Sequence, residues 1–517
     1  MELKKLSLVA AFLGATAFAG TQTQAHEHLR VVDTPLQLRI HMHWARGRGY
    51  DPNYPVERAA SAMTGVSLVD ATLGTNANDS REAHNLLIAS GSIPDIFGGS
   101  DVLDFVNEYG PQGAFLPLDD LISEHAPNIA AFMEERPDLF NAVRGADGNL
   151  YFIPYFPDGV FGQGYFIRQD WLDALGLEQP QNVDELYDVL IAFRDQDPNG
   201  NGLADEIPFF ARQPAELIRL VTLWDGRSSG SDTHHDFLVE NGRITHPYIG
   251  DGYREGMTNL ARWYAERLID PEVFTRGASA RDFLLSQNLG GMTHDWFAST
   301  AAYNDRLQDS VDGFNFVAFP PPASVSGVRI AEHRRILVKP DGWAIGHTNR
   351  DPGATMRYFD FWFTEEGRRL ANFGIEGEHY DMIDGSPVFR DEVLNSDQSV
   401  AAQMYQIGAQ MFRGYRQDYE YERQWTNPVA LEGIALYEEG DYLVPDFLGV
   451  TFTPQERAVY DRRWPSIRTF MLEKQQSWIL GASDITADWE GYLRTIERMG
   501  MNEVLAVMQA AYDRQQN

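Results

Sequence analysis

Oxygen-bearing side chains gather between Asp197 and Glu206, in the segment DPNGNGLADE. With Asp197 as position 1, side-chain oxygens fall at positions 1, 3, 5, 9 and 10, and Gly202 at position 6 allows a sharp turn. Calcium takes about six to eight oxygen ligands from loops of this kind. An EF-hand would carry a bidentate Glu at position 12, where this chain has Pro208. The spacing therefore predicts a free-standing calcium loop rather than an EF-hand.

An alternative interpretation of this loop is an ordinary solvent-exposed turn, since Asp-Pro and Asn-Gly pairs both mark turns. Three carboxylates within ten residues repel one another without a cation, which favours the metal site. The chain has no Cys and the loop has no His, so zinc does not fit. A shell filled by protein oxygens leaves little room for a substrate, so the calcium is expected to be structural. The predicted ligands are Asp197, Asn199, Asn201, Leu203, Asp205 and Glu206.

The residues before the loop predict a helix that the loop would anchor. Asn182 can cap its first turn, and Glu185 stands three residues further on. The apolar positions then recur at helical spacing and form one face. They are Leu186, Val189, Leu190 and Phe193.

The first 25 residues resemble a secretory signal peptide. Lys4 and Lys5 precede an apolar run and then small residues before a cleavage site after Ala25 or Ala19. The apolar run is too short to span a membrane. Because the chain has no Cys, no lipid-modified Cys can follow the cleavage site. The sequence thus predicts a free periplasmic protein without a lipid anchor.

Charge and length restrict the function further. The net charge of the 517-residue chain is −33, and removing Lys4, Lys5 and Glu2 with the signal peptide makes it −34. Nucleic acid and anionic membranes are poor partners for such a surface. A chain of this length can bury a large core without disulfides and is expected to form two or more domains. Strand and helix signals alternate from residue 36 onward, which is typical of the α/β class.

Several blocks of sequence carry a family resemblance. They resemble the periplasmic alginate-oligosaccharide-binding proteins, a family of extracellular solute-binding proteins of carbohydrate ABC importers, and they extend over essentially the whole mature chain. The blocks are His41–His43, Tyr151–Val160 (YFIPYFPDGV), Thr293–Thr300 (THDWFAST), Pro340–Ile345 (PDGWAI) and Asp418–Thr426 (DYEYERQWT).

The resemblance implies a two-lobed periplasmic binding protein fold of the class II type, with hinge segments and a ligand cleft between the lobes. It places residues 26–155 in an N-terminal lobe to which about 319–380 return. Residues 156–318, with the calcium loop, would form a C-terminal lobe that about 381–517 mostly join. The implied function is to capture alginate fragments and deliver them to ABC transporter permease subunits, as a monomer and without catalysis.

The same resemblance implies a set of sugar-binding residues. Tyr155, Trp296, Tyr421 and Trp425 would stack on sugar rings, and Glu422 would bond to hydroxyl groups. Acidic sugars also need cations for their carboxylates. Asn78 is expected near the rim of the cleft. The candidates for carboxylate binding are Arg46, Arg48, Arg334, Arg335, Lys339 and Arg423.

Other functions stay open at this point. The offsets of Arg46 and Arg48 differ from the family pattern, and Lys339 stands where the family has an Arg, so the ligand can be another oligouronide, such as a glycosaminoglycan or pectin fragment. A polysaccharide lyase or hydrolase is a further alternative, although with 75 acidic residues some carboxylate pair always exists. The segment Gly226–Gly230 matches G-x-S-x-G, but a nucleophile elbow must follow a strand, and here a helix is predicted before it.

Overall fold

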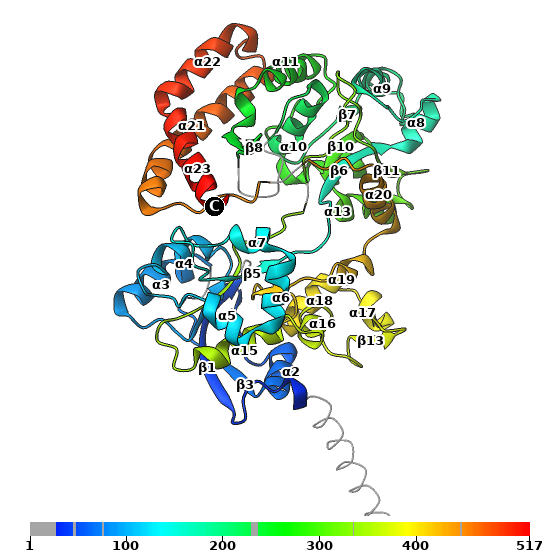
Figure 1. Cartoon of the computed structure of the whole chain (residues 1–517). Helices are drawn as coiled ribbons and strands as arrows, with labels where there is room; N and C mark the ends of the chain where they lie inside the picture. Colours follow the sequence, from blue (N-terminus) through cyan, green and yellow to red (C-terminus); the bar gives the residue numbers. More distant parts are fainter. Residues whose placement is uncertain are drawn as a thin grey trace, which may run out of the picture. The chain divides into compact units, whose positions relative to one another are not determined.

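The computed structural model describes residues 27–44, 48–74, 77–228, 236–333, 335–444 and 447–516. Packing divides the chain into two compact units, whose elements are labelled in Figure 1. Unit 1 holds the described residues up to Pro157 together with Val338–Gln424. Unit 2 holds Asp158–Leu337 together with the described residues from Trp425 onward. The predicted signal peptide, residues 1–25, lies outside the described residues.

Unit 1 is built on a mixed sheet in the order β15-β5-β12-β4-β1-β2, with β3 paired to β1. Strands β3, β1 and β4 run parallel, whereas β12 is antiparallel to both β4 and β5. The bounds are β1 (Leu36–Trp44), β2 (Arg48–Gly49), β3 (Val66–Asp70), β4 (Ile96–Gly99), β5 (Ile153–Phe156), β12 (Gly342–Ile345) and β15 (Tyr415–Arg416). A separate hairpin pairs β13 (Tyr380–Ile383) with β14 (Ser386–Phe389).

Helices of unit 1 pack around this sheet and bury apolar side chains against it. One buried cluster contains Phe97 on β4, Ala344 on β12, and Phe152. In sequence order the helices are η1 (Glu27–Leu29), α2 (Pro55–Thr64), α3 (Ala77–Ser90), α4 (Leu103–Tyr109), α5 (Asp119–His125), α6 (Pro127–Glu135), α7 (Pro137–Asn141), α15 (Pro352–Phe361), α16 (Glu365–Phe373), α17 (Asp391–Leu394), α18 (Val400–Ile407) and α19 (Glu420–Arg423).

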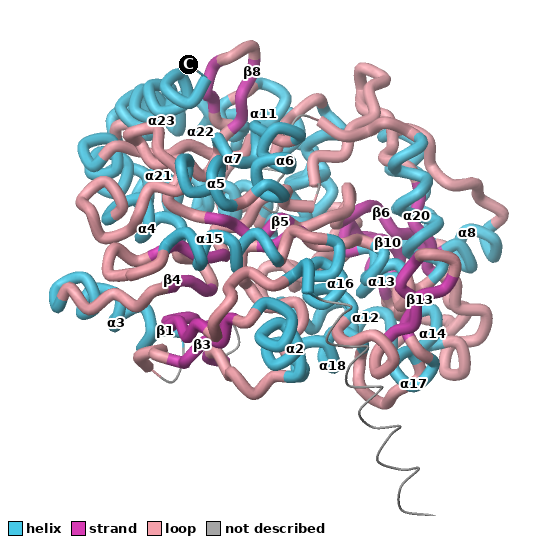
Figure 2. The backbone as a smooth tube through the Cα atoms, turned by 60° about the horizontal axis from the view of Figure 1, so that its bottom comes forward, coloured by secondary structure: helices cyan, strands magenta, loops and turns pink. Residues whose placement is uncertain are grey.

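Unit 2 has a four-stranded sheet in the order β11-β6-β10-β7. The bounds are β6 (Gln163–Arg168), β7 (Ile207–Phe209), β10 (Gly290–Trp296) and β11 (Phe316–Phe319). Figure 2 shows β6 and β10 side by side, and they pair antiparallel from Met292↔Ile167 to Trp296↔Gln163. Strands β7 and β10 are parallel, so their carboxyl ends lie at the same edge of the sheet. A small hairpin, β8 (Leu238–Glu240) with β9 (Arg243–Thr245), completes the strands described in this unit.

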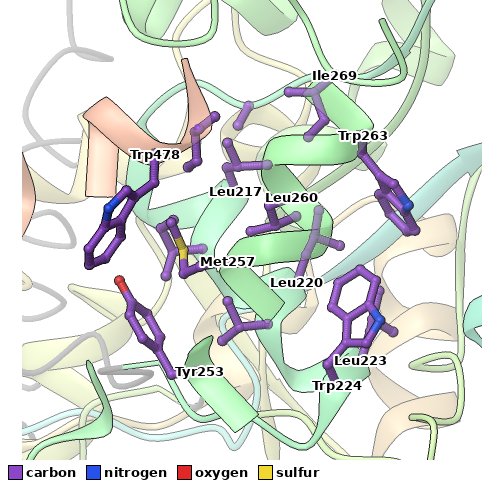
Figure 3. Close-up of a cluster of buried hydrophobic side chains, with 14 of the residues drawn as sticks. Leu217, Leu220, Leu223, Trp224, Tyr253, Met257, Leu260, Trp263, Ile269 and Trp478 are labelled. Atoms are coloured by element: carbon purple, nitrogen blue, oxygen red, sulfur yellow. The ribbon is translucent and has the colours of Figure 1, made fainter. Parts of the chain in front are cut away.

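The helices of unit 2 form its large apolar core. Figure 3 shows Leu217, Leu220 and Trp224 facing Met257 and Leu260 of α11. The helices are α8 (Gln169–Leu175), α9 (Val183–Asp195), α10 (Pro214–Ile218), η2 (Arg219–Trp224), η3 (Pro247–Ile249), α11 (Asp251–Ala265), η4 (Gly277–Ser279), α12 (Ala280–Ser286), α13 (Phe297–Ala301), α14 (Tyr303–Leu307), α20 (Pro428–Glu439), α21 (Pro454–Ile479), α22 (Ile485–Met499) and α23 (Met501–Gln516).

The chain passes between the two units at three points, and two of these points differ from the boundaries predicted from the sequence at 155, 318 and 380. The first crossing, after Pro157, lies close to the predicted one. The second lies after Leu337, because the chain beyond β11 stays on unit 2, where Ala323 bridges to Asn182. The third lies after Gln424, because β15 pairs with β5 of unit 1 and keeps the preceding segment there.

Within the ranges that the structure describes, no helix combines the length and the apolar character that crossing a membrane needs.

Candidate functional site

The loop that follows α9 in unit 2 curls around Asp197. The two carboxylate oxygens of Asp197 accept hydrogen bonds from the backbone N–H groups of Asn201 and Gly202, each at 3.0 Å. The sharp turn predicted at Gly202 is confirmed by its φ of 80°. A side chain at that φ would be strained, which is why glycine fits there. The Asn182 cap of the helix before the loop is likewise confirmed, with its side chain accepting bonds from Asp184 and Glu185.

Glu206 is the loop residue whose environment most needs a cation. Its side chain is buried, and neither carboxylate oxygen has a hydrogen-bond partner. Burial raises the pKa of Glu206 and the charges of Asp197 and Asp205 raise it further, while the backbone N–H groups of Glu206 and Asp205 oppose the rise. A buried carboxylate without a donor is costly unless a positive charge compensates it. The residues present therefore fit a bound cation.

The ionisable side chains of this loop do not by themselves supply enough ligands for a metal ion. Across the described residues, no group of three or more His, Asp and Glu side chains is arranged to hold a metal ion. The Asn201 amide instead donates to the Asp205 carboxylate at 3.0 Å. A calcium ion would thus draw on the oxygens of Asn199 and Asn201 and on the main-chain carbonyl of Leu203 as well.

In unit 1, the predicted stacking residue Tyr155 is buried, and the Lys339 ammonium lies over its ring. The ring of Tyr155 on β5 stacks on Tyr415 of β15, with 4.9 Å between centroids and 9° between planes. The Lys339 ammonium lies 5.8 Å from the centroid of the Tyr155 ring and 6.0 Å from that of Phe412. The backbone N–H of Lys339 also donates to the backbone carbonyl of Tyr155 at 3.0 Å. In the described part of the chain, no carboxylate forms an ion pair with Lys339, so its charge can serve a ligand.

The other predicted sugar residues of unit 1 lie on or beside α19. Tyr421 is buried and packs against Phe373 and Phe389, so it is mainly a core residue. Glu422 is half-buried, whereas Arg423 is exposed and pairs with Glu420 at 3.6 Å. An exposed ion pair of this kind contributes little energy. Arg423 therefore remains a weaker candidate for carboxylate binding than Lys339.

Unit 2 carries the two predicted tryptophans. Trp296 is half-buried at the carboxyl end of β10, directly before the first residue of α13. Its ring meets that of His333 edge to face, with 5.2 Å between centroids. Trp425 is half-buried in the segment between α19 and α20. The sugar residues predicted from the resemblance are thus shared between unit 1 and unit 2.

Four of the predicted residues are described incompletely. Arg46 and Arg334 lie outside the described residues. Arg48 belongs to β2 and Asn78 to α3, and of these two the structure describes the backbone alone.

Sequence reasoning missed a buried ionic cluster beside Trp296. Asp295 is fully buried and accepts bonds from Arg212 and Arg281. Glu216 is also buried and bonds to both the backbone and the side chain of Arg212. Burial, followed by the charge of Asp295, raises the pKa of Glu216 to about 7, while Arg212 opposes the rise. Arg212 and Asp295 are 83 residues apart, and no spacing in the sequence signals that they meet.

The segment Gly226–Ser228 does not form a nucleophile elbow. It follows the 3-10 helix η2 instead of a strand. The Ser228 hydroxyl donates to the carboxylate of Glu332 at 2.6 Å, and Arg227 bonds to the same carboxylate. These contacts hold the chain segment that leads to His333.

Comparison with known proteins places this architecture among binding proteins. No protein-family model matches the chain. The chain is 47% identical to the alginate-binding protein AlgQ2, whose crystal structure was determined without calcium ion. The two structures match with a TM-score of 0.77, covering 94% of this chain and 100% of AlgQ2. It is 25% identical over 474 residues to the fructooligosaccharide ABC transporter substrate-binding protein FusA of Streptococcus pneumoniae serotype 4, covering 85% of this chain and 83% of FusA.

Two further likenesses agree with this. The polygalacturonan/rhamnogalacturonan-binding protein YtcQ of Bacillus subtilis is 25% identical over 60% of this chain and 60% of its own. The structure of FusA with kestose, at 23% identity, has a TM-score of 0.68 over 93% of this chain and 99% of that one, which shows the fold alone. These neighbours confirm the predicted two-lobed α/β fold of periplasmic binding proteins. The chain belongs to the family of ABC transporter solute-binding proteins that includes the alginate-binding protein AlgQ2.

Proposed function

We propose that this protein captures acidic oligosaccharides, with alginate fragments as the ligand, and delivers them to an ABC importer. The observation that carries the ligand assignment is the Lys339 ammonium above the ring of Tyr155. Tyr155 is buried and stacked on Tyr415, so its ring supports the half-buried Lys339, whose ammonium would pair with a carboxylate of a bound sugar. The 47% identity to alginate-binding AlgQ2 supports the same assignment.

The binding residues are proposed to come from both units. Tyr155 and Lys339, with Glu422 and Arg423, would contribute from unit 1, and Trp296 and Trp425 from unit 2. Aromatic stacking gives affinity for any pyranose, whereas the cation selects charged sugars. An oligogalacturonate is the second candidate ligand, because the relative YtcQ is a polygalacturonan-binding protein.

We infer that the loop from Asp197 to Glu206 binds structural calcium. The buried and unpartnered carboxylate of Glu206 supports this inference, as do the oxygens of Asp197, Asn199, Asn201, Leu203 and Asp205 that surround the turn. When bound, calcium would neutralise these carboxylates and hold the loop closed. Among the relatives, AlgQ2 has a structure without calcium ion and FusA has one with an EF-hand mutant.

The protein is proposed to act in the periplasm as a free monomer that hands its ligand to permease subunits and performs no catalysis. Its similarity to the substrate-binding protein FusA supports the transport role. Another relative, LipO of Bacillus subtilis, is a lipoprotein. The absence of Cys from this chain argues against the same kind of anchor here.

A thermal-shift panel tests the proposed ligand. A ligand that binds only the folded protein raises its stability, and the gain grows with the logarithm of the ligand concentration relative to the Kd. Alginate oligosaccharides should raise the melting temperature more than oligogalacturonate, kestose or a neutral oligosaccharide at equal concentration. The samples are then analysed by mass spectrometry and by absorbance of unsaturated uronate. Protein-dependent cleavage products would replace the binding function with a lyase or hydrolase.

A further inference from the structure

The carboxylate of Asp295 lies where β10 turns into α13, and it is held from two sides. Arg212 donates through Nε to Oδ2 at 2.8 Å, and its Nη2 bonds to Oδ1. Arg281 donates through Nη1 to Oδ2, also at 2.8 Å. Asp295 itself is completely shielded from solvent. The carboxylate therefore has little freedom to move.

Asp295 also holds the backbone of its neighbour. The N–H of Trp296 donates to Oδ1 of Asp295 at 2.7 Å. Arg281 continues the contact into α13, because its Nη1 donates to the hydroxyls of Ser299 at 2.9 Å and Thr300 at 2.7 Å. The last residue of the strand and the first turn of the helix are thus tied to one buried carboxylate. We call Arg212, Asp295 and Arg281 the carboxylate clasp.

The ring of Trp296 is limited by further contacts. His333 meets it edge to face and is itself buried. A Cβ at Gly162 would lie 3.1 Å from Cζ3 of Trp296 and 2.9 Å from Cε1 of His333. The absence of a side chain at Gly162 therefore lets the two rings sit directly over the backbone. The contacts with His333 and with the backbone at Gly162 restrict the position and tilt of the Trp296 ring.

We propose that Asp295 is a positioning residue for ligand binding, which sets the direction of the Trp296 ring through the carboxylate clasp. This inference rests on the proposed sugar-binding function. A buried ion pair is weak support for stability as such, because the cost of removing its charges from water offsets their attraction. Its use here is geometric, since stacking depends on a ring that is already held in place.

The clasp brings together elements that are distant in sequence. Arg212 follows β7, Asp295 is the second-last residue of β10, and Arg281 lies on α12. Because β7 and β10 are parallel, Arg212 reaches Asp295 across the shared edge of the sheet. Glu216 of α10 holds Arg212 from its other side, with 2.9 Å between Oε1 and Nη2.

A double-mutant cycle measured by calorimetry with an alginate oligosaccharide tests the proposal. The four proteins are the wild type, Asp295→Asn, Trp296→Ala and the double variant. Asp295→Asn should weaken binding about tenfold when Trp296 is present and less than about twofold when it is absent, because coupled residues are not additive. A general loss of stability would weaken binding equally in both backgrounds.

Asp270→Asn is the matched control. Asp270 is another fully buried aspartate of unit 2, and Arg276 binds both of its oxygens, at 2.8 and 3.1 Å. Its replacement should lower the melting temperature and leave the Kd unchanged. If Asp295→Asn does not fold, Arg281→Gln gives the same cycle, because it keeps the bonds between Arg212 and Asp295.

Equal weakening in both backgrounds, or no weakening in either, would overturn the positioning role while leaving the proposed function intact. A wild type that shows no binding would instead overturn the proposed function on which the inference rests.

Discussion

The side-chain amide of Asn199 donates a hydrogen bond to the carbonyl of Asn288 at 3.1 Å. Asn288 stands two residues before β10 begins, so the predicted calcium loop is tied to the strand that ends in Trp296. The N–H of Ile207, directly after the loop, donates to the carbonyl of Leu289 at 2.8 Å and makes the same connection. The loop thus supports the starts of β7 and β10, whose far ends carry Arg212 and Asp295.

Removing calcium should therefore destabilise unit 2. A ligand at about 100 times its Kd stabilises a protein by about 2.7 kcal/mol, so chelation should cost a similar amount. Asp197→Ala with Asp205→Ala should abolish the response to chelator. Melting curves with calcium and with chelator measure the effect. Asp251→Ala with Glu255→Ala, two exposed acidic residues of α11, should keep the calcium response, and an equal loss there would count against the loop.

The variant Glu206→Gln separates two effects on stability: the cost of burying the Glu206 carboxylate without calcium, and the stabilisation gained when calcium binds. In chelator the variant should be as stable as the wild type or more stable, because a neutral amide costs less to bury than an unpartnered carboxylate. With calcium it should gain less than the wild type. Melting temperatures of the two proteins in both conditions check this. A variant that is less stable than the wild type in chelator and gains equally from calcium would contradict the role of Glu206.

Glu216 should make stability depend on pH. Its pKa is raised from 4.5 to about 7 in the folded protein. The folded state thus binds the proton more tightly, so this contribution is fully present below pH 4.5 and is lost as pH rises through 7. A difference of this size is worth roughly 3 kcal/mol.

Glu216→Gln removes this titration. Urea unfolding at pH 5 and pH 8 should show the wild type losing up to roughly 3 kcal/mol relative to the variant between the two values. Parallel pH profiles for the two proteins would show that Arg212 keeps Glu216 ionised throughout.

Replacing Lys339 and replacing Trp425 should weaken sugar binding in different ways, because one contact depends on the charge of the ligand and the other does not. Lys339→Gln should weaken binding of a native oligouronide by about tenfold or more and leave its carboxyl-reduced form almost unaffected, since a charged hydrogen bond is worth about 1.5–3 kcal/mol. Trp425→Ala should weaken both sugars, because stacking does not depend on charge. Calorimetry of each variant with both sugars distinguishes the two effects. If Lys339→Gln weakens both sugars equally, the ammonium acts through the Tyr155 stack and not on a carboxylate.

The turn at Gly202 and the helix before it could be predicted because their signals are local. The Asn182 cap and the turn at Gly202 each depend on residues within a few positions. The fold class followed from the alternation of strands and helices, and the blocks around Trp296 identified the family. Such patterns need no knowledge of distant contacts.

The unit boundaries and the carboxylate clasp could not be predicted in the same way. Residues 381–424 return to unit 1 because β15 pairs with β5, and the two-residue strand β15 has no pattern of its own. The helix predicted before Gly226 is in fact the short α10 followed by the 3-10 helix η2. Arg212 and Asp295 meet only because β7 and β10 are neighbours, which the sheet topology decides.

The most direct test of acidic-oligosaccharide binding compares the wild type with one alginate oligosaccharide in its native and carboxyl-reduced forms by titration calorimetry. The native form should bind at least about tenfold more tightly, since one charge-assisted hydrogen bond to a carboxylate accounts for that ratio. Equal affinity for the two forms would contradict the account and make the protein a binder of neutral oligosaccharides.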